Sequence, residues 1–177
     1  LALPLVSFAH LLSLGHGSYG EIQLFDYHLT LARIDKLSLV WGYIFHLAAF
    51  LCALYSVHVK DPIQHVAGFI YAGSAIAGAF AGDLITLFVC WELTAVSSVF
   101  LIWARHTDRS YKAGMRYLVI QVGSGVILLA GVLIHYGDTG SLAFVHLGDL
   151  SFTDNLGPTL IFIAFGIKCA FPFLHNW

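Results

Sequence analysis

Five long apolar runs constrain the fold of this chain more than any other feature of its sequence. Each has roughly the 17 to 25 residues that an α-helix needs to cross a bilayer core of about 30 Å. A shorter apolar segment, residues 1–14, is interpreted as the end of one further helix. The pattern predicts an all-α, polytopic transmembrane helix bundle. The five predicted spans are residues 37–58, 63–81, 83–103, 117–136 and 156–177.

The composition supports a membrane location and argues against a nucleic-acid partner. The chain is 59% hydrophobic and 10% charged, with a mean hydropathy of +0.83, whereas soluble domains are about 25% charged. The formal net charge is −2, and no run of basic residues is longer than two. Proteins that grip phosphate backbones need clustered Lys and Arg. We therefore predict an integral membrane protein that binds no nucleic acid.

The cysteines and histidines do not form a recognisable metal or cofactor motif. Cys52, Cys90 and Cys169 all lie in apolar segments without CxxC spacing, which is typical of small buried side chains. The ten histidines include no pair at HxxxH spacing, as neighbouring ligands on one helix face would require. The sequence offers no flavin, haem or iron–sulfur ligand set. No metal or cofactor is predicted.

The segment before the first complete span differs from the rest of the chain. Residues 15–36 are predicted to form an extracytoplasmic loop, and within it "IQLFDYHLTLARID" shows partial alternation of apolar and polar residues. Such alternation favours a short pair of strands. Because the chain begins inside an apolar run and ends at Trp177 within a motif, we expect a segment of a longer protein.

The charged residues outside the spans divide unequally when the connecting loops are assigned to alternate sides. The side with more Lys and Arg in short loops is normally cytoplasmic, which predicts that loops 59–62 and 104–116 are cytoplasmic. That side holds Lys60, Arg105, Arg109, Lys112 and Arg116 against Asp61 and Asp108. The other side holds Arg33 and Lys36 against Glu21, Asp26, Asp35, Asp83, Asp138, Asp149 and Asp154.

Two residues of opposite charge, Glu92 and Lys168, lie inside predicted spans. A charged side chain at the bilayer centre costs roughly 2.5 to 3.5 kcal/mol on insertion scales, so such residues usually face the bundle interior and mark ion paths. Glu92 lies about 14 Å beyond Asp83 and Lys168 about 18 Å beyond Leu156, both in helices that run inward. The two charges are therefore predicted at similar depths.

Two interpretations of this pair stay open at the level of sequence. In the first, the pair is a static link between two helices. In the second, the Glu92 carboxylate stabilises the Lys168 ammonium by about 4 kcal/mol at about 4 Å, and Lys168 releases its proton when Glu92 moves away. Pro172 would break the last helix beside a hydrated path, and His175 would exchange the proton. An arginine could not replace Lys168 in this role.

Three segments resemble one known family. "GDLITLFVCWELTAVSSVFLIW" resembles the glutamate-bearing fifth helix of the antiporter-like family, which includes subunits of Mrp-type cation/proton antiporters and membrane-arm subunits of NADH:quinone oxidoreductase. "AGMRYLVIQVGSGVILLAG" is similar to its sixth helix. "FGIKCAFPFLHNW" is similar to its seventh, where a lysine is followed at +7 by histidine and at +9 by tryptophan. The resemblance covers roughly residues 37–177.

The resemblance implies a discontinuous last helix in the first inverted repeat of a longer bundle. It implies that Glu92 and Lys168 form the family's ion pair and that His175 lies at its broken helix. Pro172 departs from the pattern, because the family usually has it one position later. Arg116 matches a basic residue that often opens the sixth helix, although a snorkelling arginine explains it equally well.

Asp83 has two interpretations, as a channel-mouth acid or as the cap of its helix. The cap is favoured because Asp at a helix start suits the helix dipole.

Three functions are compatible with these features. The first is a proton and Na⁺ or K⁺ translocating subunit of a multisubunit antiporter, most similar to the D-type chain of Mrp antiporters. The second is a proton-pumping membrane-arm subunit of NADH:quinone oxidoreductase or a related hydrogenase. The third is a non-conducting structural subunit. In each case we expect other membrane subunits as partners, a bacterial inner (plasma) membrane location, and no redox centre on this chain.

Overall fold

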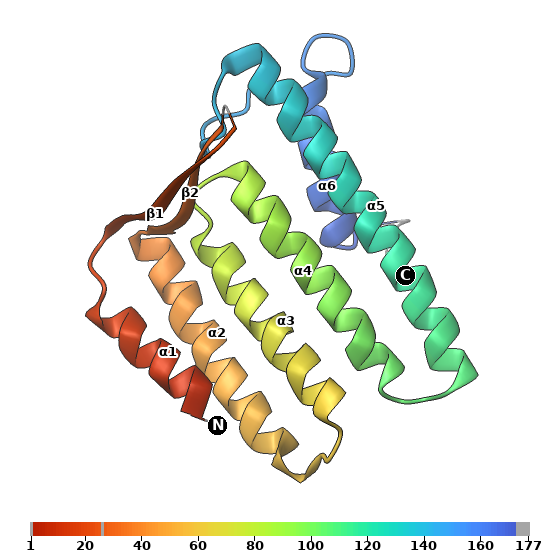
Figure 1. Cartoon of the computed structure of the whole chain (residues 1–177). Helices are drawn as coiled ribbons and strands as arrows, with labels where there is room; N and C mark the ends of the chain where they lie inside the picture. Colours follow the sequence, from red (N-terminus) through yellow and green to blue (C-terminus); the bar gives the residue numbers. More distant parts are fainter. Residues whose placement is uncertain (1, 26, 173–177) are drawn as a thin grey trace.

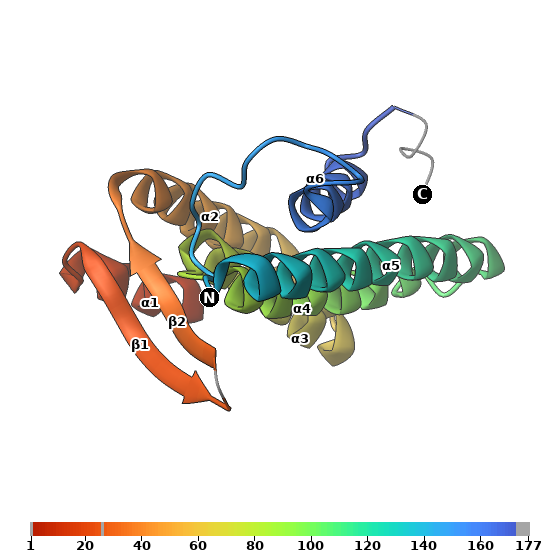
Figure 2. The same ribbon diagram turned by 90° about the horizontal axis from the view of Figure 1, so that it is seen from above.

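The structure of the chain, a computed structural model, describes residues 2–25 and 27–172. Four long helices lie side by side, a β-hairpin covers one end of them, and a shorter last helix packs behind the fourth (Figures 1 and 2). The elements in order are α1 (Ala2–Ser13), β1 (Gly17–Leu24), β2 (Tyr27–Ile34), α2 (Lys36–Tyr55), the short 3₁₀ helix η1 (Ser56–His58), α3 (Pro62–Phe80), α4 (Leu84–Trp103), α5 (Asp108–Thr139) and α6 (Leu156–Lys168).

The described part of the chain has four helices long and apolar enough to cross a membrane: α2 with η1, α3, α4 and α5. Their outward faces carry large apolar side chains, among them Leu47, Val66 and Val119, which are 59–67% exposed. In water such a surface would be strongly unfavourable, whereas in lipid it matches the solvent. The predicted all-α, polytopic membrane fold is confirmed.

The segment 104–116, interpreted from sequence as a loop, is largely helical. α5 begins at Asp108, because Thr107 and Ser110 form a capping box in which each side chain accepts a hydrogen bond from the other's backbone N–H, both at 3.1 Å. Hydropathy marks only the part of a helix that lies in lipid, so polar first turns escape it. The basic residues of this segment therefore lie mainly on the first turns of α5.

The last predicted span, residues 156–177, ends as a helix at Lys168. α6 has 13 residues, or about 20 Å, which is shorter than the bilayer core. It closes with a Schellman motif: Phe171 N donates to Gly166 O (2.9 Å) and Ala170 N to Ile167 O (3.1 Å). Ala170 adopts a left-handed φ of 54°. The helix thus stops before Pro172, which lies just beyond the cap.

The amino-terminal loop forms an antiparallel hairpin in which Gly17 pairs with Ile34 and Leu24 with Tyr27. The hairpin sits at the end of the bundle opposite the connections 59–61 and 104–107 (Figure 1). Thr30 in β2 fastens it there: its N–H donates to Asp83 Oδ2 (2.6 Å) and its carbonyl accepts from Gly82 N (3.1 Å). One strand thereby fixes the junction between α3 and α4.

Glycines let α4, α5 and α6 approach closely. A methyl group on Gly114 of α5 would overlap the Trp103 indole of α4. On the other side of α5, a methyl group on Gly131 would lie 2.8 Å from Gly157 O, and one on Gly157 would lie 2.8 Å from His135 N. The α5–α6 contact is therefore backbone against backbone. Such approaches are typical of packing between transmembrane helices.

Candidate functional site

Glu92 lies on α4 with its carboxylate against the backbone of α5. A methyl group on Gly125 would overlap this carboxylate, with the Glu92 Cδ only 2.6 Å away. Gly125 therefore makes room for the acid. Within the part of the chain that the structure describes, the buried Oε1 atom of Glu92 has no hydrogen-bond partner.

Lys168 is the last residue of α6, and its ammonium nitrogen is likewise buried and without a hydrogen-bond partner among the described residues. Nζ lies 4.8 Å from the centroid of the Trp91 ring of α4, a cation–π geometry that favours the charged amine. The carboxyl end of a helix also favours a cation, because its free carbonyls carry partial negative charge. The ammonium thus lies against a ring at a helix end, and no carboxylate oxygen of the described residues lies within 4.0 Å of it.

The two charges stand at the same height but are not in contact. α6 runs antiparallel to α5, with Ile161 against Gly131. Seven residues further along α6, about 10 Å, Lys168 is level with Ser124, next to the Gly125 on which Glu92 lies. The described residues contain one ion pair within 4.0 Å, Arg33–Asp35 at 3.5 Å. The charged atoms of Glu92 and Lys168 are therefore more than 4.0 Å apart.

Three further buried polar atoms of the described chain lack a hydrogen-bond partner: Trp91 Nε1, Gln121 Oε1 and His135 Nε2. All three belong to α4 or α5, as Glu92 does. Sequence reasoning missed Gln121 and Trp91 because it counted only ionisable residues inside the spans. The signal that could have found the amide was Gln121 itself, a polar residue in the middle of an apolar run.

Two predicted elements of the site lie at or beyond the last described residue. Pro172 follows the end of α6 by four residues and is exposed. His175 and Trp177 lie outside the described residues. The proton-exchanging role of His175 therefore stays a prediction.

Asp83 is a helix cap and not an open acid. It is 4% exposed and accepts hydrogen bonds from Thr86 N (2.7 Å), Thr86 Oγ1 (2.9 Å) and Thr30 N. Arg116 is exposed on α5, on a surface with Arg109 and Lys112. The structure brings neither Asp83 nor Arg116 into the Glu92–Lys168 site.

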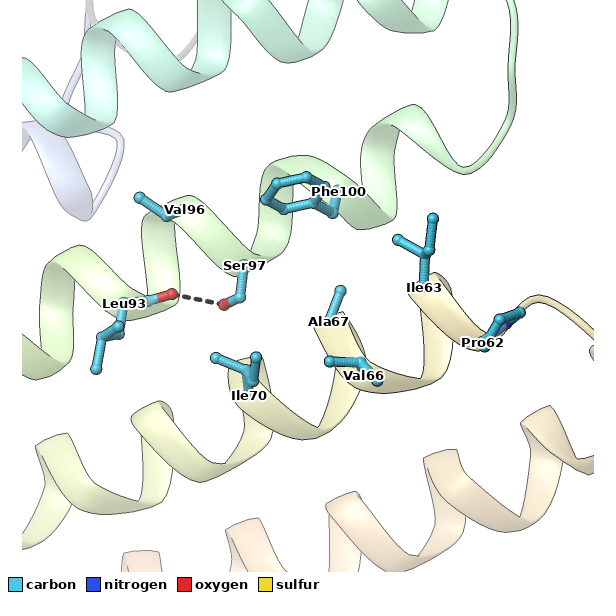
Figure 3. Close-up of a pocket in the computed structure, with 9 residues that line it drawn as sticks. All are labelled: Pro62, Ile63, Val66, Ala67, Ile70, Leu93, Val96, Ser97 and Phe100. Atoms are coloured by element: carbon cyan, nitrogen blue, oxygen red, sulfur yellow. Dashed lines mark hydrogen bonds between the residues drawn. The ribbon is translucent and has the colours of Figure 1, made fainter.

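A separate groove of about 430 Å³ lies between α3 and α4 (Figure 3). Its lining is apolar apart from Ser97, whose hydroxyl donates to Leu93 O at 2.6 Å. The groove has no polar group free to recognise an ion. Among the described residues, no group of three His, Cys, Asp or Glu side chains could hold a metal ion either.

These features define the class as a polytopic membrane bundle with two opposite charges at one height, the second on a helix that stops level with the middle of α5. The chain belongs to the NADH:quinone oxidoreductase/Mrp antiporter transmembrane family, which matches residues 81–177. The family expected from the sequence is thereby confirmed.

Relatives extend the similarity beyond the family match. The chain is 30% identical over 159 residues to hydrogenase-4 component B of Escherichia coli, covering 84% of this chain and 24% of that protein. It is 30% identical over 155 residues to NADH-quinone oxidoreductase subunit N of Desulfitobacterium hafniense, covering 81% and 31%. The chain thus spans about a quarter to a third of the length of these relatives.

The fold is also found in a solved structure. A chain of the membrane-bound sulfane sulfur reductase, an archaeal respiratory membrane complex, superposes with a TM-score of 0.76. The match covers 99% of this chain and 38% of the other, at 21% sequence identity. At that identity the likeness concerns the fold alone.

Proposed function

We propose that the chain is part of a proton-translocating membrane subunit in which Glu92 and Lys168 act as a gated proton relay. One observation carries the proposal: the Glu92 Oε1 and Lys168 Nζ atoms are buried at the same height, and neither atom has a hydrogen-bond partner in the described chain. A buried charge without a partner is unfavourable. If the pair served only to lock two helices together, we would expect its nitrogen and oxygen atoms within 4 Å of each other. The Glu92 and Lys168 atoms are farther apart than that.

The relay works by changing the gap between the two groups. At about 4 Å a carboxylate stabilises an ammonium by about 4 kcal/mol. When the groups separate, the ammonium loses that stabilisation and passes one proton to a neighbouring water, leaving a neutral amine. His175 is the proposed next acceptor. The amine is then recharged by a proton that arrives at Glu92.

The complex that contains the subunit has two candidate forms. The sequence favoured a subunit of a Na⁺ or K⁺/proton antiporter with other membrane subunits. The relatives favour the second form, because they are named as components of a hydrogenase and of NADH-quinone oxidoreductase. In that form the redox centres would belong to partner subunits. Co-purification separates the two: small antiporter subunits in one case and cluster-bearing subunits in the other.

Replacing Lys168 tests the relay in the full-length protein within its complex. Lys168→Ala is expected to abolish proton translocation in inverted membrane vesicles, followed with a pH-sensitive dye after addition of Na⁺, K⁺ or a reductant. Lys168→Arg is expected to abolish it too, because arginine keeps its charge but does not release its proton.

The arginine variant distinguishes the relay from a static pair, because arginine would preserve a static pair. Assembly of the complex, measured by co-purification, should survive in both variants. Normal translocation by an assembled Lys168→Arg complex would rule out the relay and favour the structural alternative.

A further inference from the structure

We propose that protons reach Glu92 from the inner face along a polar ladder between α4 and α5, formed by Tyr117, Ser98 and Gln121. The inner face is the end of the bundle that carries the connections 59–61 and 104–107. The inference rests on the proposed function, since it supplies the proton that the relay passes on.

The contacts between the antiparallel helices α4 and α5 show where the polar ladder lies. Trp103 packs on Gly114 near the inner end, and eleven residues further along both helices Glu92 packs on Gly125. Between these contacts, Ser98 Oγ donates to the Tyr117 hydroxyl at 2.8 Å. Gln121 lies one turn beyond Tyr117 and one turn, about 6 Å, short of Gly125. The amide therefore stands between the hydroxyl pair and the carboxylate.

Because Gln121 is buried, it is the critical residue of the polar ladder. Its side chain is 1% exposed, and its Oε1 atom has no hydrogen-bond partner among the described residues. Apolar residues of the same two helices, Val99 and Leu128, are buried to the same degree, at 0–1% exposure. An amide oxygen buried in this way is unfavourable unless a donor bonds to it.

Water is the occupant that this arrangement fits. A buried water needs two to four polar partners, and Gln121 Oε1, Glu92 Oε1 and Lys168 Nζ are all without one in the described chain. Glu92 packs on Gly125, which lies one turn along α5 from Gln121. A bridging water spans such a spacing. We assign the space between these atoms to bound water.

Each group of the polar ladder returns to its original protonation state after a proton has passed. A proton from the inner aqueous phase enters at the Tyr117 and Ser98 hydroxyls, where each oxygen accepts one proton and gives up its own. The water held by Gln121 passes the proton to the Glu92 carboxylate, and the resulting acid protonates the neutral amine of Lys168. Gln121 does not titrate. It is a positioning residue that holds the water in an apolar layer.

The test compares two substitutions of Gln121 in the full-length protein within its complex. Gln121→Leu removes the amide and should slow proton translocation about tenfold, the change that about 1.4 kcal/mol in a barrier produces. Gln121→Glu keeps the acceptor oxygen and should retain more than half of the rate, with an altered pH profile.

A purely structural role for Gln121 predicts the opposite order. A leucine would be tolerated in an apolar layer, while a buried carboxylate would be destabilising. That opposite order would overturn the ladder. Ser74→Ala is the matched control, because Ser74 is a buried polar residue on α3, bonded to Thr94 at 2.9 Å and outside the ladder. Its rate should be unchanged.

Two further variants keep the test decisive if Gln121→Leu does not assemble. Tyr117→Phe and Ser98→Ala each remove one hydroxyl of the ladder and should also slow translocation about tenfold. Normal rates in both would overturn the ladder. If they are normal while Lys168→Arg is inactive, the proposed function stands and only the entry route is wrong. If Lys168→Arg is active as well, the function itself fails.

Discussion

At the scale of single residues, a glycine governs the position of the buried acid. Two glycines lie two residues apart on α5, and their surroundings differ completely. A methyl group on Gly125 would overlap the Glu92 carboxylate, whereas one on Gly123 would meet nothing within 4 Å. The first glycine makes room for the acid, whereas the second has open space where a side chain would lie.

These two positions form a matched pair of variants. Gly125→Ala should displace the Glu92 carboxylate, destabilise the protein by about 1–3 kcal/mol through overpacking, and reduce proton translocation strongly. Gly123→Ala should leave translocation unchanged and stabilise the helix by up to about 1 kcal/mol. Thermal unfolding of the purified full-length protein and vesicle translocation measure both effects. Equal behaviour of the two variants would contradict the placement of Glu92.

At the scale of elements, α6 is a short helix held in place by its contact with α5. It ends through a Schellman motif with Ala170 in a left-handed conformation, which a residue with a Cβ adopts at a cost of about 1 kcal/mol. The contact depends on Gly131 and Gly157. The position of Lys168 is therefore set by packing two to three turns away.

A methyl group introduced into this contact should move Lys168. Gly157→Ala would place a Cβ 2.8 Å from His135 N and 3.0 Å from Gly131 O, which are backbone atoms that cannot turn away. We expect a loss of about 1–3 kcal/mol of stability and a clear drop in translocation with Glu92 and Lys168 both intact. Gly137→Ala is the control, since nothing lies within 4 Å of its added Cβ. Translocation at the wild-type rate by the Gly157→Ala variant would show that the position of α6 does not matter for proton translocation.

At the scale of the whole molecule, the distribution of charges predicts an orientation in the membrane. The end with connections 59–61 and 104–107 carries the basic excess, while the hairpin and the 140–155 connection lie at the other end (Figure 1). From the positive-inside rule we predict that the first end faces the cytoplasm. This also sets the direction of the proposed ladder, which opens toward that end.

Cysteine labelling tests the orientation in a background where Cys52, Cys90 and Cys169 are replaced by alanine. A membrane-impermeant maleimide applied to intact cells with an accessible outer surface should label Asp149→Cys and leave Lys60→Cys untouched, because both positions are exposed but at opposite ends. Inverted vesicles should give the reverse. Labelling of Lys60→Cys from outside would refute the orientation and reverse the entry route.

The fold was predictable because lipid imposes a simple rule on sequence. Helices that cross a bilayer need long apolar runs, and the runs containing Glu92 and Lys168 identified the two charges at matching depth. Gln121 was not predicted as a site residue, because an uncharged polar residue changes the hydropathy of an apolar run little. The start of α5 escaped because Thr107 and Ser110 cap it outside the lipid, where hydropathy carries no signal.

The sequence by itself determined the membrane fold, the family and the two buried charges, since these follow from which side chains water or lipid accepts. Only the tertiary structure decided that Glu92 and Lys168 lie at one height without forming an ion pair within 4.0 Å, that Gly125 admits the acid, and that α6 stops at Lys168. These features depend on how closely three helices approach. That distance is set by contacts between residues far apart in the chain, which no local pattern encodes.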